Sequence, residues 1–313
     1  MTGAMATIPY YDAEAVTRAT PMPALIAALR RAFASGEYHA PPRLAADMGG
    51  ASLLVMPAWK GSARVGAKIV TVDPRTRPSI QSTYILSDRT SGRPVAAIDG
   101  AALTRRRTAA ASVLAASRLA RPASATLLVI GTGALNAPII EAYASAFALN
   151  RILVWGRDAD KAEAAAHAAR EQGYSVAAIA TVEAGLAEAD IVSAATLATR
   201  PLIAGAALRP GMHIDLIGAF RPDMCEADAE AFARARLFVD THDGAMEEAG
   251  DLLKAIAAGA IAADAIEADL AALCSGAHPG RGEDNAAITL FKSVGTAIED
   301  LAAAELVTGD AAP

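Results

Sequence analysis

Cysteine, aromatic residues and runs of positive charge are scarce in this sequence, and each scarcity excludes a class of protein. The two cysteines, Cys225 and Cys274, cannot build a disulfide framework, which fits a reducing compartment. Aromatic residues make up only 4% of the chain, too few for the stacking platforms that bind single-stranded nucleic acid. The net charge of -6 and the lack of a Lys/Arg run longer than three residues argue against DNA, RNA or an anionic membrane as partner.

Long apolar runs and metal-site spacings are also missing from the sequence. No apolar run approaches the length of a membrane-spanning helix, and no Cys/His spacing resembles a zinc site. The first residues, MTGAMATIPYYDAEAV, lack the basic and apolar regions of a secretory signal. We therefore expect a cytoplasmic protein that binds neither a metal nor a membrane.

The sequence is rich in alanine, and its pattern changes along the chain. Residues 12–35 predict one helix, 40–100 predict short and mainly antiparallel strands, and 102–120 predict a long helix. From residue 123 apolar runs alternate with helical patterns, which indicates βαβ units and a mostly parallel sheet. The strand candidates there are 126–131, 151–156, 175–179, 190–196, 212–218 and 236–240. Residues 288–307 predict a helix beyond the last strand.

Residues 127–143, LLVIGTGALNAPIIEAY, predict a strand, a glycine turn and a helix. Gly131 permits the tight turn, and Gly133 lets the backbone approach a pyrophosphate at the start of the helix. Asn136 stands where a third small residue is expected, and Pro138 falls near the first helical turn, where a missing donor costs little. Because the third glycine mainly serves helix packing, the loop still predicts a dinucleotide site; a purely structural turn is the alternative.

The end of the next strand bears on which nucleotide is bound. An acidic residue there would bind the adenine ribose of NAD, but the sequence has Gly156, followed by Arg157 and Asp158. Arg157 can hold a 2′-phosphate through two hydrogen bonds, which favours NADP(H) over NAD(H). Asp158 could still bind a ribose, and Arg157 could be a solvated surface residue.

Several motifs, taken in order, resemble the ornithine cyclodeaminase/μ-crystallin family over about residues 8–307. They are Pro42-Arg43, Met56-Pro57, the Lys68 strand, DRTSGRP at 88–94, Arg107-Thr108-Ala109-Ala110, Gly131-Thr132-Gly133-Ala134 and the terminal GRGEDNAAITLFKSVGTAIEDLAAA. The resemblance implies an α/β fold with two domains. Residues 1–122 with 286–313 would form an α+β domain for substrate binding and homodimerisation, and residues 123–285 a Rossmann-type, doubly wound parallel sheet.

The resemblance also implies roles for individual residues. Arg43, Lys68 and Arg107 match positions that grip a substrate carboxylate, and Ser79 matches a threonine that touches the same group. A guanidinium fork suits a carboxylate, and a buried Lys68 beside other cations could act as the catalytic acid. Residues expected to contact the cofactor are Thr108, Gly131, Thr132, Gly133, Ala134, Leu135, Arg157, Gly218 and Ser293.

Two departures from the cyclodeaminases concern the substrate. Phe220 stands where they carry an aspartate that handles protons and activates water, and Asp223 lies three residues further on, across a proline. Leu54 stands where they carry a carboxylate that holds the side-chain amine of ornithine. An ammonium beside leucine would lose its hydration without gaining a partner. Both departures favour a more apolar substrate than ornithine.

The sequence therefore predicts an NAD(P)H-dependent reductase of a carboxylate-bearing imine, such as a cyclic ketimine, or in reverse an amino-acid dehydrogenase. The cofactor would supply the hydride, while the protein supplies orientation and a proton. One alternative is ornithine cyclodeaminase, which forms proline and ammonia. Another is an NADPH-dependent binding protein for a small ligand. The expected partners are a small-molecule substrate and a second copy of the chain.

Overall fold

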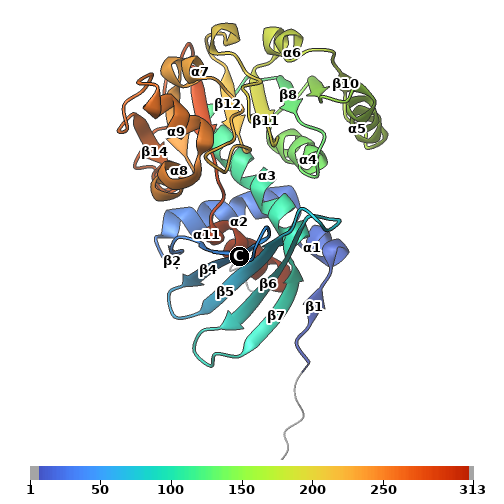
Figure 1. Ribbon diagram of the computed structural model, residues 1–313, viewed down its shortest axis with the longest axis vertical. Helices are drawn as coiled ribbons and strands as arrows, with labels where there is room; N and C mark the ends of the chain where they lie inside the picture. The colour runs from blue at the N-terminus through green and yellow to red at the C-terminus, as the bar shows by residue number, and fades with distance from the viewer. Residues whose placement is uncertain (1–6, 310–313) are drawn as a thin grey trace, which may run out of the picture. The chain divides into compact units, whose positions relative to one another are not determined.

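The structure, a computed structural model, describes residues 7–309 and divides into two compact units. The first unit comprises the chain up to Arg107 together with the segment from Thr296 onward (blue to teal and dark red in Figure 1). The second unit is Thr108–Gly295. Helix α3 (Gly100–Leu119) carries the boundary between Arg107 and Thr108.

The first unit is built on a seven-stranded sheet whose main path is β1-β7-β6-β5-β4-β2, with β3 pairing with β4. All pairs are antiparallel except β1 with β7, as the alternating runs in residues 40–100 predict. The strands are β1 (Tyr10–Tyr11), β2 (Tyr38–His39), β3 (Leu44–Asp47), β4 (Ser52–Lys60), β5 (Arg64–Val72), β6 (Ile80–Asp88) and β7 (Pro94–Asp99).

Three helices pack with this sheet: α1 (Ala13–Ala19), α2 (Met22–Ser35) and α11 (Ala297–Thr308). Side chains on the helix-covered face are buried, among them Met56, Lys68, Tyr84 and Leu86. The side chains that alternate with them point to the opposite face and remain partly or fully exposed; they include Leu53, Val55, Val65, Ala67, Ile69, Ile85 and Val95. The first unit thus has one packed face and one apolar face that its own helices leave uncovered.

The single helix predicted over residues 12–35 is in fact two helices. Helix α1 ends at the cap residue Thr20, and Pro21 is the N-cap of α2, with Pro23 in its first turn. A proline ring biases the preceding residue away from the helical region, so the chain turns between the two helices.

The second unit is an eight-stranded, wholly parallel sheet in the order β10-β9-β8-β11-β12-β15-β13-β14. Its strands are β8 (Thr126–Ile130), β9 (Arg151–Trp155), β10 (Val176–Ala178), β11 (Ile191–Ala194), β12 (His213–Leu216), β13 (Arg236–Val239), β14 (Ile266–Asp269) and β15 (Thr289–Lys292). The connecting helices are α4 (Asn136–Ala146), α5 (Ala159–Glu171), α6 (Val182–Glu188), α7 (Ala229–Arg234), α8 (His242–Glu248), α9 (Gly250–Ala257) and α10 (Leu270–Ser275), with a 3₁₀ turn at Gly205–Ala207 (Figure 1). This is the expected Rossmann-type arrangement.

The helix predicted over residues 288–307 is wrong in its first half. Residues Thr289–Lys292 form β15, which lies between β12 and β13, and only Ala297–Thr308 is helical. A strand buried on both faces has a continuous apolar pattern that periodicity cannot distinguish from a buried helix. Strand β14 was not predicted at all.

The unit boundaries also differ from the predicted division at 122/123 and 285/286. The second half of α3 belongs to the second unit because Ser112 donates to Asp215 of β12 over 3.1 Å. Residues up to Gly295 belong there because β15 is a strand of its sheet.

In the part of the chain that the structure describes, no helix is both long and apolar enough to cross a membrane.

Candidate functional site

The loop after β8 has the geometry that its glycines predict. Gly131 adopts a φ of 124°, and a Cβ on it would lie 2.7 Å from the carbonyl oxygen of Ala195. Only glycine fits such a close approach of two backbones with a positive φ. Gly133 is exposed with open space around it. The loop then opens α4, whose first backbone N–H groups point toward its N-terminal end.

Asn136 compensates for the missing third glycine. Its side-chain nitrogen donates to the carbonyl oxygen of Gly131 over 2.7 Å, and the residue is buried at the start of α4. Pro138 is the third residue of that helix, where an unused N–H costs little. The loop is therefore held by a hydrogen bond rather than by glycine packing.

A cavity of about 490 Å³ opens at this loop, and we call it the glycine-loop cavity. Its lining includes Gly131, Thr132, Gly133, Trp155, Gly156, Arg157, Asp158, Lys161, Thr196, Leu197, Arg200 and Leu202. It extends from the end of β9 to the segment after β11, at the carboxyl ends of the parallel strands where open α/β sheets bind their ligands. Ala134 lines a smaller neighbouring cavity of about 230 Å³, and Leu135 is the N-cap residue of α4.

The end of β9 carries cations and leaves no room for an acid. A Cβ on Gly156 would lie 2.6 Å from Cγ2 of Thr132, so a longer side chain there would collide with the loop. Asp158 uses its carboxylate as the N-cap of α5, accepting from the backbone of Asp160 at 3.1 Å and of Lys161 at 3.2 Å. Arg157 and Lys161 are both exposed on the cavity wall.

The remaining residues expected to contact a cofactor are buried. Thr108 follows Arg107 on α3, and Gly218 lies just beyond β12. The backbone of Ser293, just after β15, donates to the carbonyl oxygen of Leu216 over 3.0 Å. None of these three is among the residues that line the glycine-loop cavity, so their roles stay predictions.

Lys68 lies in a buried ionic cluster within the first unit. Its ammonium is 2.8 Å from one carboxylate oxygen of Asp300 and donates to Thr104 over 3.2 Å. Arg107 reaches the same Asp300 at 3.1 Å and Glu299 at 2.5 Å. Strand β5 supplies the lysine, α3 the arginine and α11 both carboxylates.

Burial lowers the pKa of Lys68 to about 8; Asp300 opposes this shift, while Arg107 and Arg43 add to it. Arg43, half-buried between β2 and β3, is therefore close enough to influence Lys68 electrostatically. The structure thus brings together the three cations that the sequence singles out. We call Arg43, Lys68 and Arg107 the cation cluster. A lysine with this pKa can exchange a proton near neutral pH.

Asp300 and Glu299 were missed by the sequence analysis. Both are buried, and Lys68 and Arg107 hold the pKa of Asp300 below its ordinary value against the opposing effect of burial. The available signal was the pair Glu-Asp inside an otherwise apolar helix, since carboxylates are almost never fully buried unless paired.

Ser79 is not brought to the cation cluster within this chain. It lies at the turn before β6, where its carbonyl oxygen accepts from the backbone of Asp73 over 2.8 Å. Tyr84 is the residue that pairs with Lys68, and it lies five positions after Ser79 in the chain. Along a strand, five residues correspond to about 16 Å, so Ser79 lies too far from Lys68 to join the cluster. Leu54, in contrast, is on the same face of the sheet as Lys68, because Leu54 pairs with Val70 and Met56 with Lys68.

Phe220, which the family resemblance places at the position of the cyclodeaminases' aspartate, packs against the hydrophobic core of the second unit. Asp223 does not take over that role by position, since it is exposed and bound to Arg221 at 3.0 and 3.1 Å.

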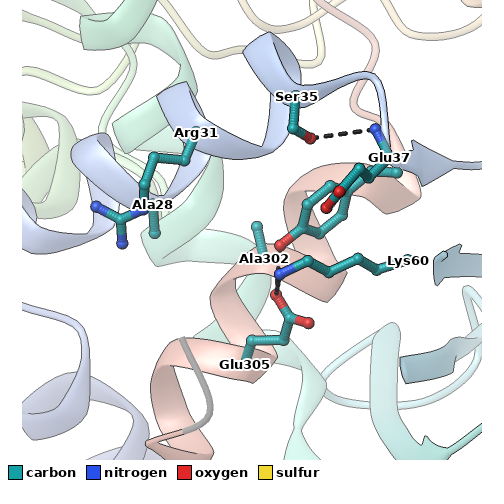
Figure 2. A pocket seen from close by; sticks show the side chains of 8 residues that line it. Ala28, Arg31, Ser35, Glu37, Lys60, Ala302 and Glu305 are labelled. Atoms are coloured by element: carbon teal, nitrogen blue, oxygen red, sulfur yellow. Dashed lines mark hydrogen bonds and ion pairs between the residues drawn. The ribbon is translucent and has the colours of Figure 1, made fainter. Parts of the chain in front are cut away.

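A second cavity, of about 190 Å³, lies within the first unit between α2, β4 and α11 (Figure 2). Glu305 is buried at its wall, accepts a hydrogen bond from the hydroxyl of Tyr38 and lies 3.7 Å from the ammonium of Lys60. Arg31 and Glu37 also line it (Figure 2). The carboxylate of Glu305 is already bound by Tyr38 and Lys60, so these two contacts account for its burial.

Comparison with known proteins places these features in context. A family model described as ornithine cyclodeaminase/mu-crystallin family matches residues 7–312. The Delta(1)-pyrroline-2-carboxylate reductase of Paracoccus denitrificans is 40% identical over 256 residues, 80% of each chain. The structure of the Thermococcus litoralis enzyme of the same name, in complex with NADH and L-proline, has a TM-score of 0.92 at 29% identity and covers 97% of both chains. An archaeal alanine dehydrogenase dimer with bound NAD has a TM-score of 0.89 at 27% identity, covering 97% of this chain and 96% of that one.

Proposed function

The chain belongs to the ornithine cyclodeaminase/mu-crystallin family, and we propose that it is an NAD(P)H-dependent oxidoreductase that reduces a carboxylate-bearing imine. The preferred substrate class is a cyclic ketimine such as a pyrroline carboxylate. The observation that carries this proposal is the cation cluster, in which a fully buried lysine with a pKa of about 8 lies among arginines. The similar reductases from Paracoccus denitrificans and Thermococcus litoralis bear names of the same reaction class.

The glycine-loop cavity is suited to a dinucleotide. Gly131, Thr132 and Gly133 would face the pyrophosphate, which the open N-terminal end of α4 also favours. The bound cofactor would supply a hydride in reduction, or accept one in the reverse reaction.

We propose NADP(H) as the preferred cofactor. Gly156 leaves no room for an acid that would bind a ribose, and Asp158 is committed to capping α5. Arg157 and Lys161, both exposed at the same end of the cavity, offer two cations to a 2′-phosphate. The two similar solved structures hold NADH and NAD, so this preference is the point on which we expect the chain to differ from them.

The residues of the first unit would hold and protonate the substrate. The guanidinium groups of Arg43 and Arg107 suit its carboxylate, and Lys68 would donate a proton to the imine nitrogen. Asp300 holds the lysine ammonium in place, at 2.8 Å. Addition of a hydride to the imine carbon and a proton to the nitrogen gives the amine, and Lys68 is left neutral to be reprotonated from solvent. In reverse, neutral Lys68 takes the proton from an amino acid.

Two departures from the cyclodeaminases favour substrates without a second charge. Leu54 shares the face of the sheet with Lys68, and Phe220, in the second unit, carries no group that could activate water. Ornithine cyclisation needs both a partner for the distal ammonium and a proton-handling group. We therefore place ornithine cyclodeaminase behind imine reduction.

We further propose that the chain forms a homodimer through the apolar sheet face of the first unit. Ile69 at its centre is 42% exposed, and exposed contiguous apolar faces are typical of interaction sites. The archaeal alanine dehydrogenase of similar structure is a dimer. A cytoplasmic location is proposed with it, since Cys225 and Cys274 are free thiols.

The experiment that tests the function is NADPH consumption with Δ1-pyrroline-2-carboxylate, followed by absorbance, with NADH in a parallel assay. Ornithine with NAD serves as the comparison reaction. Consumption of NADPH and formation of proline would support the proposal. Ammonia and proline from ornithine without net change in NAD would replace it with cyclodeamination. Ligand-induced stabilisation by NADPH without any turnover would indicate a binding protein.

A further inference from the structure

A second buried ionic cluster, outside the cation cluster, lies entirely within the second unit. It consists of Glu226, Asp251 and Lys292, and we call it the turn cluster. All three side chains are at most 1% exposed. The ammonium of Lys292 lies 3.4 Å from Asp251 and donates to the carbonyl oxygen of Gly218. The backbone N–H of Glu226 points to Asp251 at 3.5 Å.

The turn that this cluster contacts is strained. Ala219 has a φ of 53°, the only positive φ at a non-glycine residue in the described chain. This conformation costs on the order of 1 kcal/mol for alanine, so surrounding contacts must hold it. Lys292 binds the carbonyl oxygen of Gly218 on one side of it, and Gly250 donates to the carbonyl oxygen of Ala219 over 2.8 Å on the other. A Cβ on Gly218 would collide with Glu226 and with the backbone of Thr196.

Glu226 connects the turn to the wall of the glycine-loop cavity. One of its carboxylate oxygens, Oε1, accepts from the backbone N–H of Thr196 at 2.7 Å and from its hydroxyl at 2.8 Å. Thr196 is a lining residue of that cavity. The other oxygen, Oε2, has no hydrogen-bond partner among the described residues. The carboxyl group of Glu226 thus binds Thr196 in the segment after β11 and packs against Gly218 in the segment after β12.

The strand order identifies which half of a dinucleotide these segments would meet. The order reverses between β8 and β11, and the adenosine half belongs with β9, where Arg157 and Lys161 lie. The other mononucleotide half therefore belongs with β11 and β12. Thr196 and the Gly218–Ala219 turn follow the carboxyl ends of those two strands.

We propose that the turn cluster is a positioning device for the nicotinamide half of the cofactor, acting through the Gly218–Ala219 turn and Thr196. This inference rests on the proposed function for its cofactor class and adds the residues that set the orientation of the reacting ring. Glu226 and Lys292 are positioning residues, since each acts through a backbone segment. Three buried ionisable groups are an expensive way to fill a core, because apolar side chains of similar volume would often be as stable.

The test compares two ligands that differ only by the nicotinamide ring. NADPH carries this ring, whereas 2′-phospho-ADP-ribose keeps both riboses and both bridging phosphates and lacks the ring. Affinities would be measured through the fluorescence of Trp155, which lines the glycine-loop cavity. The variants are Lys292→Met, which removes the bond to Gly218, and Glu226→Ala, which removes the acceptor of both Thr196 hydrogen bonds. Asp215→Asn is the matched control, because Asp215 is an equally buried carboxyl of β12 that binds Ser112, Tyr143 and Ser193 instead.

Lys292→Met is expected to weaken NADPH binding about tenfold and to leave 2′-phospho-ADP-ribose binding within about twofold. Glu226→Ala is expected to show the same selective loss of NADPH affinity, whereas Asp215→Asn is expected to stay close to the wild type for both ligands. In turnover, the deuterium isotope effect with labelled NADPH should increase for Lys292→Met, because misplacing the reacting ring slows hydride transfer by up to roughly 10²-fold. Equal weakening of both ligands would overturn the proposal, and so would an unchanged ratio in a folded variant.

Failure of the proposed reaction is distinguishable from failure of this inference. If no imine is reduced, the affinity ratio of the two ligands still reports on the turn cluster. If Lys292→Met does not fold, Lys292→Arg retains the charge and tests the same bond, with a shifted affinity ratio as the expected result. An unshifted ratio for the folded Lys292→Arg variant would count against the proposal.

Discussion

Asp300 lies 2.8 Å from the ammonium of Lys68, and both side chains are buried inside the first unit. The carboxylate raises the pKa of Lys68, while burial, Arg107 and Arg43 lower it to about 8. The protonation of the lysine near neutral pH is therefore decided by a residue from the last helix of the described chain.

Replacing Asp300 with asparagine should lower the pKa of Lys68 further. Imine reduction needs protonated Lys68, so its kcat/KM should fall as pH rises through about 8 in the wild type and at lower pH in the variant. Amino-acid oxidation needs the neutral lysine, so its kcat/KM should rise as pH rises through about 8. The measurement is a pH profile in both directions, with Glu305→Gln on the same helix as control, since Glu305 contacts Tyr38 and Lys60. Identical profiles for Asp300→Asn and wild type would exclude Lys68 as the acid.

Arg157→Ala should reduce the affinity for NADPH by about 1.5–3 kcal/mol, roughly tenfold to a hundredfold, because a charge-assisted hydrogen bond to the phosphate is lost. NADH affinity should change little. Arg151→Ala is the matched control, since Arg151 is an exposed arginine at the opposite end of β9, paired with Glu188. Equal losses for both dinucleotides would show that Arg157 does not read the 2′-phosphate.

The space beside Gly156 offers a way to reverse cofactor preference. Gly156→Asp alone should bind both cofactors poorly, because its Cβ would lie 2.6 Å from Cγ2 of Thr132. Combined with Thr132→Ala, the new carboxylate gains room to accept from the ribose hydroxyls of NADH and repels a 2′-phosphate. The dissociation constants of the double variant for NADH and NADPH would show whether its cofactor preference has reversed. A double variant that still prefers NADPH would contradict this account of the strand end.

Glu226 should make the stability of the second unit depend on pH. Burial raises its pKa from the ordinary 4.5 to about 8, an effect that Asp251 increases and Lys292 opposes. Between these two values the folded chain holds a proton that the unfolded chain releases. The stabilising contribution is therefore complete below pH 4.5 and is lost as pH rises to about 8, with a slope of up to about 1.4 kcal/mol per pH unit.

Glu226→Gln removes this titration, so its stability relative to the wild type should increase with pH up to about 8 and then level off. Urea unfolding at several pH values measures the difference. Asp215→Asn should behave differently, because burial raises the pKa of Asp215 only to about 6 and its effect should end there. Parallel stability curves for wild type and Glu226→Gln would mean that Glu226 is ionised in the folded chain.

The local patterns of this sequence predict much of the fold. Strand-turn-helix at 127–143 and the alternating runs before residue 100 identify both kinds of sheet, since period and glycine placement are local properties. They could not identify β15, because a central parallel strand has an unbroken apolar run whose partners are distant in sequence. The same reason hides Asp300, whose pairing with Arg107 joins positions 193 residues apart.

Asn136 illustrates a different limit. In the sequence, Asn136 departs from the glycine pattern and therefore weakens the prediction of a dinucleotide site. Only the structure shows that its side chain donates to the carbonyl oxygen of Gly131 and so stabilises the loop. Lys68, Arg107 and Arg43 were singled out by the family resemblance, and their roles stay predictions. The resemblance did not point to their carboxylate partners, Glu299 and Asp300, which are recognised only from their contacts in the structure.

Because α11 completes the first unit, the order of synthesis on the ribosome separates Lys68 and Arg107 from their carboxylate partners. Lys68 and Arg107 emerge early, and the whole parallel sheet of the second unit is translated before Glu299 and Asp300. A nascent chain that stops before residue 299 would thus contain the complete glycine loop, while Lys68 and Arg107 would lack both their counter-charges and the helix that covers them.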